Sequence, residues 1–172
     1  MILVETDVSE EWDSSTDWAA LAGKAVETAV AASRQRALGD SGVTVEVSVK
    51  LTHDGEVRAL NAAWRGKDKP TNVLSFPMFE ADLLGSLAGA GEGEILLGDI
   101  ALAHGVCARE AEEKGVTACA HAFHLVVHGT LHLLGYDHEE GEGEAEADEM
   151  ERVEREALAR VGIADPYPVE SR

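Results

Sequence analysis

The sequence predicts a single α+β domain, residues 1–172, in which one small mixed β-sheet packs against several helices. Short segments with a two-residue hydrophobic period, typical of half-buried strands, are separated by longer segments with helical spacing. A length of 172 residues is typical of one domain, and no internal repeat divides the chain. Strands interleaved with helices in a chain of this size favour one layer of sheet packed with helices.

The predicted strands are short apolar or alternating segments bounded by turn residues. The clearest is 43–51, where Val and Leu alternate with polar side chains. Residues 2–8 alternate weakly and are expected at a sheet edge, and the segment from Val73 stops at Pro77, which cannot donate a ladder hydrogen bond. We therefore expect strands over residues 2–8, 43–51, 73–77 and 94–103.

The predicted helices share apolar residues spaced three and four apart. The alanine-rich segment 16–37 can be capped by Thr16 or Asp17. The segment 117–134 is nearly all apolar, so it is expected to be central and buried. We expect helices over residues 16–37, 56–64, 104–113, 117–134 and 144–160.

Two connecting segments differ in composition. Residues 80–93 contain glycines among small and acidic residues and predict a flexible loop, whereas residues 65–72 form a polar, basic connector. The net charge of −19 counts against a generic nucleic-acid binder, so any contacts to a nucleic acid would have to come from local basic residues. Much of the acid lies in the first few residues and in the segment 139–156; if it points away from the functional site, it adds solubility and affects binding little.

The composition also indicates a cytoplasmic protein with no membrane association. Acid precedes any apolar stretch of signal-peptide length, and no later apolar run approaches the about 20 residues that span a bilayer. Cys107 and Cys119 match no common zinc spacing, and we expect both to be free thiols on helices.

The strongest functional pattern runs from His128 to His138. His128 and His132 are four residues apart on a predicted helix, so both imidazoles lie on one face, close enough to share a metal ion. Gly135 can end the helix, after which His138 can reach the same point from the side. Three imidazoles plus a water make a catalytic zinc site with one open position, and we expect one zinc ion per chain on this central helix and the loop after it.

The spacing H-x-x-x-H-x-x-G-x-x-H is that of the metzincin proteases, with one difference. The proteases carry a glutamate directly after the first histidine, where it acts as general base. Gly129 occupies that position here and has no side chain. A zinc peptidase of metzincin type stays open as an alternative, disfavoured by Gly129 unless a base comes from elsewhere in the fold.

The same stretch, His128 to His138, resembles the motif H-G-x-L-H-L-x-G-Y-D-H of the bacterial YbeY family. Two upstream stretches, Trp64 to Pro77 and Leu97 to Ile100, also resemble motifs of that family and run in its order. The resemblance implies a single-strand-specific, metal-dependent endoribonuclease. It further implies maturation of the 3′ end of small-subunit ribosomal RNA, ribosome quality control, and RNA precursors with the ribosome or ribosomal proteins as partners.

Roles for individual residues follow from this hypothesis. Arg65 matches an arginine that is functionally important in the family, and its planar fork of donors suits a phosphate. Lys67 and Lys69 supply a local basic patch for RNA, and Asn72 and Ser75 are candidates to donate hydrogen bonds to the substrate. The alternative for each of these residues is that it is an ordinary solvated residue with no role in binding.

Several neighbouring residues have less certain roles. His124 is one turn before His128 and either supports the site or is a satisfied helix histidine, while Asp137 can orient a histidine or act as base. Asp99 is expected to hydrogen-bond the histidine helix, and Trp64 to lie in the core, with base stacking as the alternative. A last alternative for the whole protein is a non-catalytic, zinc-stabilised ribosome-associated factor, which would need four protein ligands and no open position.

Overall fold

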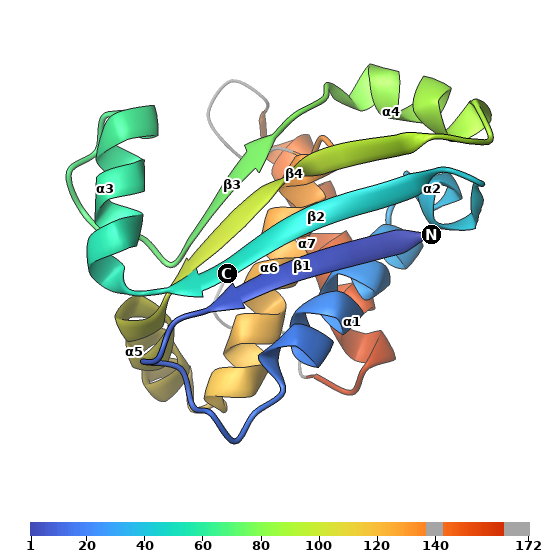
Figure 1. The fold of residues 1–172 in the computed structure, drawn as a ribbon. Coiled ribbons are helices and arrows are strands. Elements are labelled where there is room, and N and C mark those ends of the chain that lie inside the picture. The colour runs from blue at the N-terminus through green and yellow to red at the C-terminus, as the bar shows by residue number, and fades with distance from the viewer. Residues whose placement is uncertain (137–142, 164–172) are drawn as a thin grey trace.

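The computed structural model describes residues 1–136 and 143–163 and confirms an α+β fold with one mixed sheet (Figure 1). The elements follow in the order β1 (Ile2–Val8), α1 (Trp18–Ala32), α2 (Ala37–Asp40), β2 (Thr44–Thr52), α3 (Asp54–Arg65), β3 (Val73–Pro77), α4 (Ala81–Gly89), β4 (Glu94–Ala103), α5 (His104–Lys114), α6 (Ala118–Leu133) and α7 (Gly143–Arg160). No helix within the described ranges is both long and apolar enough to cross a membrane.

The four strands form one sheet in the order β1-β2-β4-β3. β2 pairs in parallel with β1 and β4, and β3 runs antiparallel to β4 along the other edge. Every second residue of β2 is fully buried, as its period-two sequence predicts. The expected strands are confirmed to within one residue, including the edge position of the N-terminal strand.

Helices α1, α6 and α7 cover one face of the sheet and enclose the main core (Figure 1). α6 lies so close to β4 that a Cβ on Gly129 would be 3.1 Å from Ile100. The opposite face is largely open, with α3 and α4 near opposite ends of the sheet. Only a small cluster of Val57, Leu74 and Ala103 builds a second core there, beneath α3.

The first helix ends earlier than the sequence predicts. α1 stops at Ala32, and the buried Ser33 donates both its hydroxyl and its N–H to the carbonyl of Val30, at 2.8 and 3.1 Å. A serine that satisfies backbone groups itself competes with helix continuation. The expected helix over 16–37 is therefore shortened to α1, with Asp17 as its N-cap, and a separate short helix, α2, begins at Ala37.

The glycine-rich segment 80–93 is a second correction, because α4 occupies much of it. Leu84 is fully buried, and Leu87 and Ala88 pack against the main core. This spacing of three and four residues builds an apolar stripe whose burial outweighs the cost of glycine within a helix, about 1 kcal/mol each. The many glycines of this segment obscured its apolar spacing in the sequence, which is why a loop was predicted.

The central helix α6 begins and ends as predicted. The hydroxyl of Thr117 accepts a hydrogen bond from the N–H of Ala120 at 3.0 Å and caps its first turn. Gly135, just beyond the end, has φ +98° and lies against Ala81, so both conformation and space require glycine. Burial of α6 on most sides fixes the orientation of the histidines that it carries.

Candidate metal centre and its surroundings

Four histidines lie in a row on α6. His121, His124, His128 and His132 are spaced by three or four residues, and successive ring centroids are 5.8, 6.4 and 4.8 Å apart. The first two are buried, whereas His128 and His132 are partly exposed. The row therefore leads from the protein interior to an accessible pair.

Carboxylates from the two flanking helices hold this row in place. Glu110 of α5 lies 2.8 Å from Nε2 of His121. Glu154 of α7 accepts from Nε2 of His124 at 3.0 Å and from Nδ1 of His128 at 2.5 Å. Burial by itself raises the pKa of Glu154, but the hydrogen bonds from His124 and His128 more than offset it and hold that pKa well below its usual range. Glu154 is therefore an ionised acceptor.

The hydrogen bonds at Nδ1 indicate which nitrogen of each accessible histidine carries the proton. Nδ1 of His128 faces the Glu154 carboxylate, and Nδ1 of His132 lies 3.0 Å from the carbonyl oxygen of Tyr136. Both partners only accept, so both Nδ1 atoms carry the proton. In the neutral imidazoles the lone pairs are consequently on Nε2, and the two Nε2 atoms face one another at 3.2 Å.

This arrangement fits a zinc ion. Two nitrogens bound tetrahedrally to one zinc, each at about 2.05 Å, lie about 3.3 Å apart. The observed separation of the Nε2 atoms of His128 and His132 is 3.2 Å, and the rings are held from behind as metal-binding histidines usually are. A cation between them satisfies both lone pairs.

Two of the predicted site residues cannot be placed. His138 and Asp137 lie outside the described residues, so their predicted roles as third ligand and as orienting group or base stay predictions. Within the ranges 1–136 and 143–163, no set of three His, Cys, Asp or Glu side chains is arranged to hold a metal ion. The described part therefore contributes a two-histidine half of a site.

The predicted basic residues lie at the end of α3 and in the connector after it. Arg65 is the last residue of the helix, which Gly66 ends with φ +70°, and Arg65, Lys67 and Lys69 are all exposed. Asp68 between the lysines accepts from the guanidinium of Arg58 at 2.8 and 3.2 Å. That pairing occupies the single acid of the connector, on either side of which Lys67 and Lys69 are exposed.

The other two substrate-binding candidates differ from one another. The side-chain amide of Asn72 donates to Glu110 at 3.0 Å, and its oxygen accepts from the N–H of Val73 at 2.7 Å. Asn72 thus ties the start of β3 to α5, which gives it a structural role. Ser75 pairs with Ile100 across the sheet, and cross-strand partners share a face. Because Ile100 contacts α6, Ser75 is on the same side of the sheet as the histidine helix.

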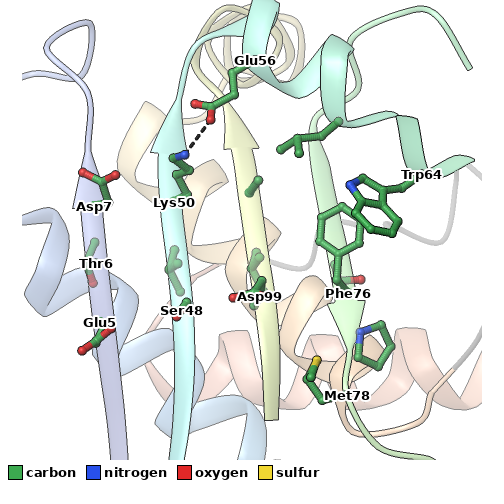
Figure 2. Close-up of a pocket in the computed structure, with 16 residues that line it drawn as sticks. Glu5, Thr6, Asp7, Ser48, Lys50, Glu56, Trp64, Phe76, Met78 and Asp99 are labelled. Atoms are coloured by element: carbon green, nitrogen blue, oxygen red, sulfur yellow. Dashed lines mark hydrogen bonds and ion pairs between the residues drawn. The ribbon is translucent and has the colours of Figure 1, made fainter. Parts of the chain in front are cut away.

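The open face of the sheet forms a separate groove of about 1080 Å³. Figure 2 shows Glu5 and Asp7 on β1, Asp99 on β4 and the ion pair of Lys50 with Glu56 along it. Its acids outnumber its single lysine, so phosphates are repelled from this face. The first acidic residues of the chain therefore line this groove, which is separate from the histidine pair.

Two expectations about this region are wrong. Trp64 is 72% exposed at the groove, with its ring 6.4 Å from that of Phe76, rather than in the core. It is near the end of α3, whose apolar face is completed by other residues. Asp99 is exposed on the open face, because strand alternation turns Ile100, not Asp99, toward the histidine helix.

Sequence reasoning missed the carboxylates that hold the histidines. Glu154 was given no role and was counted only within the acidic segment 139–156, yet it is fully buried. A signal was present, since Glu154 is four residues from both Met150 and Leu158, on the apolar face of α7. An acid in that stripe predicts a buried polar partner.

Comparison with known proteins identifies the family of this chain. A family model described as Endoribonuclease YbeY matches residues 7–162. A protein named Endoribonuclease YbeY from Sphingopyxis alaskensis is 55% identical over 97% of this chain and 98% of its own length. One of the same name from Rhizorhabdus wittichii is 54% identical over 98% of both chains. The solution structure of TM1509 from Thermotoga maritima aligns with a TM-score of 0.55 at 25% identity, covering 92% of this chain and 91% of that one. The chain therefore belongs to the endoribonuclease YbeY family.

Proposed function

We propose that this protein is a single-strand-specific, zinc-dependent endoribonuclease of the cytoplasm that matures the 3′ end of small-subunit ribosomal RNA and serves ribosome quality control. Its partners in this proposal are the RNA precursor and the ribosome or its proteins. The relatives named as endoribonucleases support the reaction class. The observation that carries the metal dependence is the facing pair of Nε2 atoms in His128 and His132, each ring fixed through Nδ1.

One zinc ion per chain would be held by His128, His132 and, on the sequence motif, His138. When bound there, zinc would activate a water molecule for hydrolysis at neutral pH. The chain's own residues bind and orient the RNA. Arg65 binds the scissile phosphate and stabilises charge that develops on it, because its guanidinium matches a phosphate with two parallel hydrogen bonds.

The surrounding residues divide into those that meet RNA and those that do not. Lys67 and Lys69 bind the backbone on either side of the cleaved bond, since they are exposed and the acid between them is paired with Arg58. Ser75 donates from the strand on the histidine side. Asn72 has no part in substrate binding, because its amide is held by Glu110.

Peptidase activity is disfavoured by the packing at Gly129. A side chain at this position would begin 3.1 Å from Ile100, against the sheet, so the room that a general base needs is already occupied. The peptidase alternative therefore lacks both the residue and the space for it.

The test compares wild type with His128→Ala and Arg65→Ala. We expect about one zinc per chain and cleavage of single-stranded RNA in wild type, loss of both in His128→Ala, and loss of cleavage alone in Arg65→Ala. Zinc is measured by elemental analysis and cleavage on labelled single- and double-stranded RNA. Metal-loaded wild type that leaves RNA intact in the presence of ribosomal subunits would refute the nuclease and favour a binding factor.

A further inference from the structure

We propose that Glu154 is the positioning residue of the metal site: its carboxylate fixes the tautomer and ring orientation of His128 and thereby presents Nε2 to the metal. This inference rests on the proposed function, since it concerns the affinity of the zinc site. Glu154 contacts neither RNA nor metal in this proposal, and acts on the metal through His128.

The environment of Glu154 is difficult to explain by packing. Its side chain is fully buried on α7, in the stripe formed by Met150, Val153 and Leu158. A buried carboxylate is costly, and an apolar side chain of similar size usually serves stability as well or better. Packing alone therefore does not explain a carboxylate at this position, because a methionine or leucine would pack as well. The hydrogen bond to the ligand histidine beside it explains the carboxylate.

The geometry is that of a carboxylate, histidine and metal triad. Oε1 accepts from Nδ1 of His128 at 2.5 Å, which leaves Nε2 as the metal-facing lone pair and makes that lone pair more basic. Oε2 accepts from Nε2 of His124 at 3.0 Å, so both oxygens are anchored and the plane of the carboxylate is fixed. His124, one turn earlier in α6, thus supports the metal site indirectly, by anchoring Glu154.

The two accessible histidines are held unequally. His132 donates its Nδ1 proton to a neutral carbonyl, that of Tyr136, whereas His128 donates to an ionised carboxylate. Hydrogen bonds to an ionised acceptor are roughly twice as strong as neutral ones. His128 is therefore expected to be the stronger of the two ligands, and loss of the Glu154 charge should act on it specifically.

The test compares Glu154→Gln with Glu156→Gln, a matched charge removal two residues away on the exposed side of α7. Zinc affinity is measured by competition with a chromophoric chelator, and expressed per folded molecule. We expect Glu154→Gln to weaken zinc binding by about 10- to 100-fold, and Glu156→Gln to bind as wild type does. Glu154→Asp, which keeps the charge but withdraws it by one methylene, should fall between them.

A second readout does not require metal or activity. Histidine-selective ¹⁵N NMR of the metal-free protein reports the imidazole tautomers, and wild-type His128 should carry its proton on Nδ1. An Nε2–H tautomer in wild type overturns the inference, even if Glu154→Gln does not fold. So does a folded Glu154→Gln variant with unchanged zinc affinity. Wild type that binds zinc no more tightly than His128→Ala overturns the proposed metal site itself, and this inference with it.

Discussion

Replacing Gly135 by alanine tests how the turn after the histidine helix is built. The residue has φ +98°, and a Cβ there would overlap the Cβ of Ala81 and lie 3.2 Å from its Cα. A side chain at positive φ costs about 1–2 kcal/mol, and overpacking a tight contact typically adds about 1–3 kcal/mol. We therefore expect Gly135→Ala to lower the free energy of unfolding by about 2–5 kcal/mol.

Gly115→Ala is the matched control. Gly115 ends α5 at φ +68°, and a Cβ there meets nothing within 4 Å, so only the conformational cost applies. Urea denaturation of both variants, without metal, separates the two contributions. If the two variants lose the same free energy, to within about 0.5 kcal/mol, the contact with Ala81 is not tight and the start of α4 yields at no cost.

Three further predictions concern residues away from the metal. At about pH 8, iodoacetamide should label Cys119 in the folded protein but not Cys107, because burial raises the pKa of the Cys107 thiol to about 12. Peptide mass spectrometry identifies the labelled cysteine, and equal labelling of both would contradict the prediction. The hydrogen bond from Lys50 is the first cause that holds the pKa of Glu56 below its ordinary value. The contribution of Glu56 to stability is therefore present above the ordinary carboxyl pKa and is lost as the pH falls through the lowered one, so Glu56→Gln should flatten the acid limb of urea stability curves. Tyr136→Phe should cost about 1–2 kcal/mol in the same assay, since it removes the partner of a backbone N–H at 2.9 Å.

The sequence predicted those parts of the fold in which local pattern and tertiary packing agree. β2 alternates because one of its faces lies on the core, and α6 is apolar because helices and sheet surround it. The pair His128 and His132 was predictable for the same reason, since a spacing of four on any helix places two side chains together. Ser33 and α4 were mispredicted because burial of a serine hydroxyl and of Leu84 is decided by distant segments.

Glu154 shows why the supporting residues of a site are harder to find than its ligands. Its partners His124 and His128 are 30 and 26 residues away in the sequence, on a different helix. Within the acidic segment its charge looked like one more solvated side chain. The packing of α7 against α1 and α6 turns that acid inward, and no local pattern specifies which neighbour it meets.

The overall charge of −19 poses the question of where RNA can approach. The open face of the sheet repels phosphate, because Glu5, Asp7 and Asp99 lie along its groove. The connector after α3 does not, since Lys67 and Lys69 are exposed there. If single-stranded RNA is bound through this connector, its affinity depends on a local positive charge that the net charge conceals.

The double variant Lys67→Ala/Lys69→Ala tests that route. Removing two phosphate contacts to a single strand should reduce the slope of log affinity against log salt concentration by about 1.4. The matched control is Lys24→Ala/Lys114→Ala, which removes the same charge from exposed positions on α1 and α5. Fluorescence anisotropy over a salt series measures both slopes. Equal slopes would mean that the connector lysines make no phosphate contact and act only through net charge, in which case RNA approaches the histidine pair by another path.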